Sequence, residues 1–137
     1  MNAHNIHAMA QASLSGTLPF PEIVKNLFAE GVEYYHVDYV TRQFTFYSGE
    51  GGVVTVPLTI ENLPDVAAEF NVEALRTAIV DSQRHGQKFT RFSARVMQAG
   101  VHAYFAFLRG KRVTYSGRTG DQHVEWFPVV NPKEGTN

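Results

Sequence analysis

The sequence predicts an α+β domain, a two-layer sandwich in which helices cover one face of a largely antiparallel sheet. The first observation is a repeat: Gly31-Val32 and Tyr35 recur 69 residues later as Gly100-Val101 and Tyr104. The second is that each copy reads as a helix followed by three short strands, a grouping that favours α+β over alternating α/β folds. Two copies are too few for a solenoid, which needs about three stacked units. We therefore expect one internally duplicated domain built from two helix-plus-three-strand units.

The repeat extends to the end of each copy. Tyr47-Ser48-Gly49 recurs as Tyr115-Ser116-Gly117, where the offset falls to 68 residues. Each copy then passes a glycine and ends in a short segment closed by proline, at 54–57 and 125–128. The predicted organisation is a flexible arm over 1–17, one domain over 18–128 and a polar tail over 129–137. Within the domain, repeat one spans 20–58, an inserted helix spans 71–86 and repeat two spans 89–128.

The first repeat is expected to hold a helix over 21–30 and strands over 32–39, 44–47 and 53–58. Pro21 suits the first turn of a helix, and Gly31 supplies its C-terminal stop. The first two strands form a hairpin because they are rich in tyrosine, valine and phenylalanine and lie close in sequence. The glycine-rich run 49–52 is a turn, and Pro57 indicates an edge or end position in the third strand.

A connector over 59–70 separates the two repeats. Asn71 is a good N-cap for the helix that ends at Gly86, and this helix has no counterpart in the first half as we align it. We therefore interpret it as an insertion. The second repeat is expected to hold a helix over 90–99 and strands over 101–108, 113–116 and 123–127.

Composition bounds the class of protein. The 137 residues are the usual size of one domain, and the 17 aromatic residues (10 Phe, 6 Tyr, 1 Trp) can supply its core. The absence of cysteine excludes disulfides, thiolate catalysis and cysteine-ligated zinc. No segment resembles a signal peptide or a membrane span of about 18 apolar residues. We expect a cytoplasmic protein with no membrane partner.

The net charge of −1 conceals an asymmetry. Residues 1–83 carry ten acids and three Lys or Arg, whereas residues 84–118 carry eight Lys or Arg and no acid. A polyanionic partner is one interpretation. The other is that the two halves face each other within a monomer or across a homo-oligomer, head-to-tail or two-fold. Because the overall charge is near zero, nucleic acid is not the partner we expect.

The second half carries a specific run of residues, Gly117-Arg118-Thr119-Gly120-Asp121-Gln122-His123-Val124-Glu125-Trp126-Phe127-Pro128. This run resembles the YdfO/YbcV-like family of small bacterial and prophage-encoded proteins, and residues 31–39 are similar to that family's first-strand motif. The resemblance covers about residues 20–128 and implies an α+β two-layer fold. The family is a domain of unknown function, and some members are labelled phage envelope proteins. No catalytic residues come with the resemblance.

The same run holds the first candidate site. On a strand, His123 and Glu125 point to one face, and Arg118 and Asp121 lie in the turn just before them. The group could be a base with an orienting carboxylate, or an anion clamp. The alternative is a structural network in which Glu125 pairs with Arg118 and His123 binds a backbone carbonyl.

The second candidate is His36 with Asp38, which share one face of the first strand. Their counterparts in the repeat are Phe105 and Phe107, residues typical of a core. Either the covered face differs between the halves, or His36 and Asp38 line a pocket. The alternative is a solvated strand face, with the intervening residues turned inward.

A third candidate is basic. Lys88, Arg91 and Arg95 lie on one helix face, and with the hairpin tip at 109–112 they could bind phosphate beside aromatics such as Tyr104. A solvated helix face is the alternative. No spacing matches a standard metal signature, a Gly-x-Ser-x-Gly nucleophile or a nucleotide-binding glycine loop. We therefore expect no metal and no cofactor.

Together these patterns predict a non-catalytic binding or regulatory module for a small anionic ligand or a protein partner, held near Arg118, His123 and Glu125. One alternative is a hydrolase or isomerase in which His123 is the general base, Glu125 orients it and Arg118 binds a developing anion. A second alternative is a prophage-borne protein that binds a host macromolecule in a salt-dependent complex.

Overall fold

The computed structural model describes residues 1–128, and the polar tail predicted over 129–137 lies outside them. Two successive units, each of two helices and three strands, make up the described chain. This confirms the predicted α+β class. The elements are α1 (Ala3–Ser15), α2 (Phe20–Ala29), β1 (Val32–Asp38), β2 (Gln43–Ser48), β3 (Val53–Pro57), α3 (Val72–His85), α4 (Phe89–Gln98), β4 (Val101–Phe107), β5 (Arg112–Gly117) and β6 (Gln122–Trp126).

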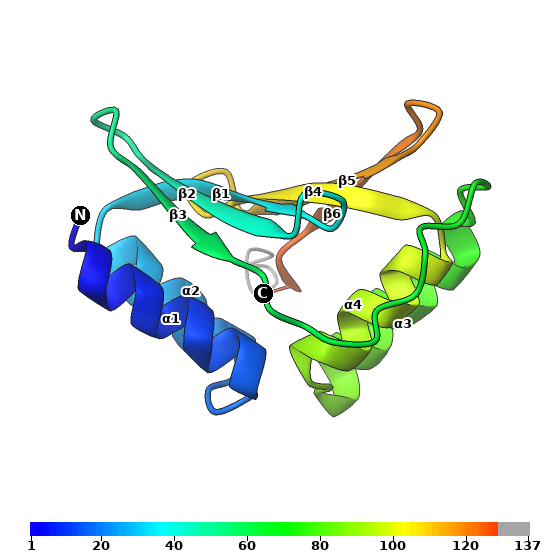
Figure 1. Ribbon diagram of the computed structural model, residues 1–137, viewed down its shortest axis with the longest axis horizontal. Helices are drawn as coiled ribbons and strands as arrows, with labels where there is room; N and C mark the ends of the chain where they lie inside the picture. The colour runs from blue at the N-terminus through cyan, green and yellow to red at the C-terminus, as the bar shows by residue number, and fades with distance from the viewer. Residues whose placement is uncertain (129–137) are drawn as a thin grey trace.

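The six strands form one antiparallel sheet in the order β3-β2-β1-β4-β5-β6. The central strands β1 and β4 come from different units, so the two halves share one sheet. Figure 1 shows the helix pairs α1–α2 and α3–α4 on the same side of this sheet. We call that side the covered face. Within residues 1–128 no helix packs on the opposite side, which we call the open face.

The duplication is a structural two-fold. β1, β2 and β3 begin 69 residues before β4, β5 and β6. In the pairing of β1 with β4, His36 lies opposite Phe105, and these two residues are each other's counterparts in the repeat. The pseudo-two-fold axis therefore passes between them. Details of the backbone are repeated as well: Arg42 and Lys111, at equivalent places in the two hairpins, both have left-handed φ angles of 61° and 60°.

Residues 1–17 correct the expectation of a flexible arm, because residues 3–15 form helix α1. Its side chains Ile6 and Ala10 are buried in the core. The helix is capped at both ends, by the Asn2 side chain, which accepts a hydrogen bond from the Asn5 amide at 3.1 Å, and by Gly16 in the left-handed conformation. Small and polar residues are compatible with a helix whose buried stripe is narrow, and this made the segment read as a loose arm.

Helix α1 also corrects the interpretation of the helix near 71–86 as an insertion. α1 begins 69 residues before α3, the same offset as the strands, so α3 has a counterpart. Leu75, equivalent to Ile6, is completely buried like it. The repeated unit is helix-helix-three-strand, and the sequence alignment missed the first helix of repeat one.

The Tyr-Ser-Gly triplets are equivalent in sequence but not in space. The strand register pairs Tyr35 with Phe46 and its counterpart Tyr104 with Tyr115, which keeps the offset at 69 and makes Phe46 the true counterpart of Tyr115. Tyr47 consequently lies on the open face, whereas Tyr115 is buried. A one-residue shift along a strand moves a side chain to the other face. The 68-residue offset between the Tyr-Ser-Gly triplets therefore aligns residues that lie on opposite faces.

Candidate functional site

His36 and Asp38 lie on the open face, while Tyr35 and Val37 between and beside them are buried under the helices. Within one chain, β1 therefore has the orientation that the solvated-face alternative described. Phe105 and Phe107, which we expected to be core residues, also lie on the open face and are partly buried there. The same face is covered in both halves, so the polar-for-aromatic exchange does not mark a change of covered face.

Asp38 has a structural partner. Its Oδ1 atom accepts hydrogen bonds from the amides of Val40 at 2.9 Å and Thr41 at 3.1 Å, and so closes the turn after β1. His36 packs its ring on Phe105, with 4.3 Å between the centroids. Burial lowers the pKa of His36 below 6.5; Asp38 opposes this shift, and His102 adds to it.

The lowered pKa of His36 predicts a pH-dependent stability. In the window below about 6.5 the unfolded chain binds a proton that the folded chain refuses, so the free energy of unfolding falls as the pH falls. We expect His36→Phe to flatten this decrease between about pH 7.5 and 5, because phenylalanine binds no proton. Phe105, the counterpart of His36 in the repeat, shows that the open face accommodates such a neutral ring. Urea unfolding at several pH values measures the slope. An unaltered slope in His36→Phe would contradict the prediction.

The four residues of the C-terminal candidate separate into three places. His123 and Glu125 form a pair, with 2.9 Å between Nε2 and Oε1, on the covered face of the edge strand β6. Asp121 accepts a hydrogen bond from the Thr119 hydroxyl at 2.6 Å within the turn. The Arg118 guanidinium donates to the carbonyl of Val66 at 3.3 Å. Glu125 is therefore paired with His123 and not, as the structural alternative required, with Arg118.

Tyr104 belongs to the core and not to an accessible site. It is 6% exposed and packs against Tyr39 and Tyr115, with centroid distances of 6.1 and 5.3 Å. Burial raises the pKa of all three phenols. The Tyr39 hydroxyl donates to the buried Ser93 hydroxyl at 2.9 Å, a bond that ties β1 to α4. Tyr104 thus fails as a ligand-binding candidate because a ligand cannot reach it.

The basic stripe on α4 is partly neutralised. Arg95 forms a salt bridge with Asp81 of α3 at 2.8 Å and also donates to the Gln87 side chain at 3.2 Å. This hydrogen bond lowers the pKa of Asp81. Lys88 and Arg91 are exposed. The stripe is a solvated helix face in which the third cation is occupied in joining two helices.

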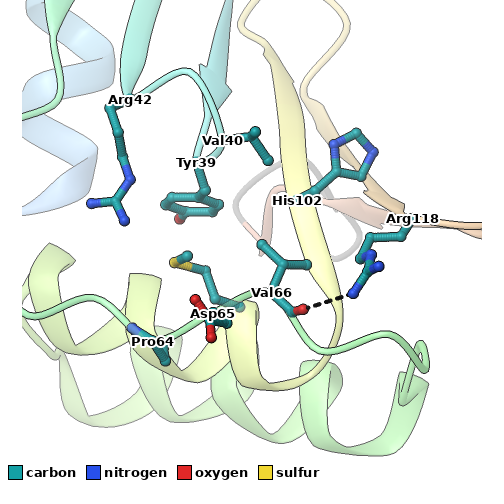
Figure 2. A pocket seen from close by; sticks show the side chains of 9 residues that line it. Tyr39, Val40, Arg42, Pro64, Asp65, Val66, His102 and Arg118 are labelled. Carbon is teal, nitrogen blue, oxygen red and sulfur yellow. Dashed lines mark hydrogen bonds between the residues drawn. The ribbon is translucent and has the colours of Figure 1, made fainter.

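The cavity that carries the strongest site chemistry was not predicted as a unit. It has a volume of about 560 Å³ and lies where the end of β1 and the start of β4 meet the connector between the units. Figure 2 shows the Arg42 side chain on one side of it and Arg118 on the other, with Asp65 between them. The lining residues are Tyr39, Val40, Arg42, Pro64, Asp65, Val66, Met97, His102 and Arg118.

The connector forms a fixed wall of this cavity. The amide of Ala67 donates to the Met97 carbonyl at 3.0 Å, and the amide of Asn71 donates to the Ala99 carbonyl at 2.8 Å, so the segment is held to the end of α4. Residues without regular secondary structure are positioned here by hydrogen bonds to a helix terminus. We expected a mere connector over 59–70, and propensities alone did not reveal this anchoring.

Each arginine of the cavity keeps most of its donors free within the described residues. Arg42 donates from Nη1 to the Ile60 carbonyl at 3.4 Å, and Arg118 donates from Nη1 to the Val66 carbonyl at 3.3 Å. Both bonds are long, and a guanidinium has five N–H donors. Among residues 1–128 neither arginine has a carboxylate within 4.0 Å, and Asp65 is no exception.

Arg42 also carries backbone strain. Its φ of 61° lies in the left-handed region, which costs a residue with a Cβ about 1–2 kcal/mol. Strain that persists at a site is an observation from which function can be hypothesised. Lys111 has the same backbone and does not line this cavity, so the hairpin geometry accounts for the strain and the side chain of Arg42 is what distinguishes the two positions.

A family model of proteins of unknown function, DUF1398, matches residues 7–125. The chain belongs to this family. The match includes both units, from within α1 to the penultimate residue of β6, so the duplicated architecture described above lies within the family's domain. No curated protein matches the chain.

Two further properties of residues 1–128 bear on the site. No group of three or more His, Cys, Asp or Glu side chains lies close enough there to hold a metal ion. The helices of the same segment are all too short or too polar to cross a membrane.

Proposed function

We propose that the protein is a non-catalytic binding module whose ligand is a small anion held between Arg42 and Arg118. The observation that carries the proposal is the pair of guanidinium groups on opposite sides of one open cavity, each with unused donors in the described chain. Its volume of about 560 Å³ lies within the range of small-molecule sites, about 300–1,000 Å³. The site keeps Arg118 from the sequence prediction and replaces His123 and Glu125 by Arg42 and His102.

The lining favours a carboxylate or phosphate. Two arginines and one aspartate leave a net charge of +1 with His102 neutral. Guanidinium groups bind carboxylate and phosphate oxygens by paired hydrogen bonds, which are about twice as strong as neutral ones. Asp65 would repel a ligand that turned a negative group towards it. It would accept a hydrogen bond from a hydroxyl or an amine of the ligand. A phosphorylated or carboxylated metabolite with one such group fits both requirements.

The proposal predicts that Arg42→Gly abolishes ligand binding but leaves the stability of the fold nearly unchanged. Glycine relieves the left-handed strain at this position, so we expect the variant to unfold within about 1 kcal/mol of the wild type. It should nevertheless lose ligand binding. A thermal-shift panel of inorganic phosphate, sugar phosphates and di- and tricarboxylates detects binding, because a ligand at about 100 times its Kd adds about 2.7 kcal/mol, which is several degrees.

Lys111→Gly is the matched control, since it relieves the same backbone strain at the equivalent hairpin outside the cavity. It should keep the ligand shift, whereas Arg118→Ala should lose it. A panel without any shift would contradict the proposal. So would a shift that survives both Arg42→Gly and Arg118→Ala.

A rival proposal is an enzyme, favoured by the 2.9 Å pair of His123 and Glu125. In a hydrolase or isomerase His123 would be the general base and Glu125 would orient it. The pair does not line the cavity between Arg42 and Arg118, and Arg118 bonds to the Val66 carbonyl. An NMR titration of His123 with and without a ligand from the panel tests the rival: a working base should change its pKa when the ligand binds. The finer resemblance, to YdfO/YbcV-like prophage proteins with a host macromolecule as partner, stays a prediction.

A further inference from the structure

The open face of the sheet carries an apolar row that crosses all six strands. Each member lies opposite the next in the strand register, so the row is continuous from edge to edge. Five of its six members are apolar or aromatic, whereas an antiparallel sheet with one face in water usually carries polar side chains there. The row, which we call the cross-strand row, is Val53, Tyr47, Tyr34, Phe107, Arg112 and Trp126.

Ring packing joins the side chains of this row to one another. Tyr34 stacks on Tyr47 at 4.6 Å and on Phe107 at 5.8 Å, and Arg112 lies over the Trp126 ring at 4.6 Å from its centroid. The ends of the row are the most accessible, with Val53 56% and Trp126 54% exposed. Rings that stack on their neighbours already use their flat faces, so the row offers ring edges, which suit another packed protein surface better than stacked bases.

A neighbouring row extends the apolar surface at the centre. It contains His36 and Phe105 on the pseudo-axis and ends at Val124, which is 44% exposed. Towards the other end of the strands the face becomes polar, with Gln43, Asp38 and Ser116 in the third row. The open face is therefore apolar along one side and polar along the other, and a partner must match that division.

We propose that a second copy of this chain covers the open face, with a two-fold axis parallel to the strands between β1 and β4. Rotation about that axis keeps each row at its height along the strands. The cross-strand row of one copy then packs on that of the other, and the polar row packs on the polar row. The same rotation exchanges the two edges of the sheet, so the first unit of one copy lies over the second unit of the other.

Charge favours this axis over the one perpendicular to the strands. In the sheet layer, residues 32–57 carry a net −2 and the equivalent residues 101–126 carry +2, with histidines neutral. An axis parallel to the strands places opposite charges against each other, whereas the perpendicular axis would oppose like charges, which is costly. Six strands at about 4.8 Å spacing and five residues of about 3.4 Å give a footprint of about 24 by 17 Å. This is about 400 Å² per copy and about 800 Å² for the pair, a size typical of weak, transient interfaces, so we expect dissociation in the micromolar range or weaker.

The oligomeric state of the full chain tests the proposal. Sedimentation equilibrium between about 1 and 200 µM should show a monomer–dimer equilibrium. Trp126→Lys should raise the dimer dissociation constant about 10-fold or more, because aromatic residues dominate interface energies. Phe28→Lys is the matched control: Phe28 is 56% exposed on α2, away from the open face, and its replacement should change nothing.

Cross-linking tests the orientation of the axis. Because the sequence has no native cysteine, introduced cysteines are the only thiols that can react. Thr55 and Val124 lie on opposite edge strands in the same row. Across packed sheets about 10 Å apart, Thr55→Cys of one copy should face Val124→Cys of the other and react with a short bis-maleimide. Either variant alone should not cross-link, because its two cysteines lie about 24 Å apart.

A chain that stays monomeric over the whole concentration range overturns the proposal. A dimer that resists Trp126→Lys, or one that Phe28→Lys weakens equally, overturns it as well, since the interface would then lie elsewhere. If the Thr55→Cys or Val124→Cys variant alone cross-linked and their mixture did not, the proposed axis would be wrong. None of these results depends on the anion cavity. The ligand panel tests the residues of that cavity separately.

Discussion

Gly100→Ala is expected to destabilise the fold by about 3 kcal/mol or more, at or above the upper end of what single substitutions usually cost. Two costs add. Gly100 has a φ of 101°, in the region that L-residues avoid, and a Cβ there would collide with the backbone of the connector, at the Glu69 carbonyl and at the Phe70 Cα, 2.9 Å away. Backbone atoms cannot rotate out of the way as a flexible side chain could.

The pseudo-symmetry supplies the control. Gly31 is the counterpart of Gly100, with a φ of 88°, yet a Cβ built there meets nothing within 4 Å. Gly31→Ala should therefore cost only the left-handed strain, about 1–2 kcal/mol. Urea unfolding of the two variants measures the difference. Equal losses would contradict the claim that the connector packs on the start of β4, and with it one wall of the anion cavity.

The strands and their inward faces could be predicted because their signal is local. Tyr35, Val37 and Tyr39 alternate with more polar residues, and this period is enough to orient β1. The repeat added the antiparallel sheet, because two equivalent sets of three strands can join edge to edge. Aromatic character predicts burial in the core, and this prediction is wrong for Phe105 and Phe107 because the open face itself is aromatic.

The site could be predicted only in part. Arg118 was a candidate because it lies in a distinctive run, and it does line the cavity. Arg42, Asp65 and His102 come from three other segments, a hairpin, the connector and the start of β4, and only the tertiary fold brings them together. The repeat aligns Arg42 with Lys111 at a hairpin end, and this local signal indicates a basic residue in both halves but not a shared cavity. His123 and Glu125 were correctly placed on one face of a strand, yet the sequence does not show that Arg118 bonds to the connector while Glu125 pairs with His123.

Helix α1 is the largest difference between expectation and structure, and Ile6→Ala tests it directly. Ile6 is completely buried among residues of the core, and α1 contacts α2, β3 and α4. Removing three buried carbon atoms leaves a cavity that the surrounding helices can fill only in part. We expect a loss of about 2–5 kcal/mol in the free energy of unfolding. A loose arm over residues 1–17 would predict no change.

Two comparisons make that result specific to the packing of α1. His7→Ala alters the adjacent exposed residue and should be neutral or slightly stabilising, because alanine is the better helix former. Leu75→Ala removes the counterpart of Ile6 from α3, which is equally buried, and should cost a similar amount. Chemical denaturation with a common m-value measures all three. If Leu75→Ala alone were destabilising, the first unit would fold without its helix and the two-fold would not extend to the helix layer; if Ile6→Ala and Leu75→Ala were alike, both units would depend on the same helix-helix-sheet contact.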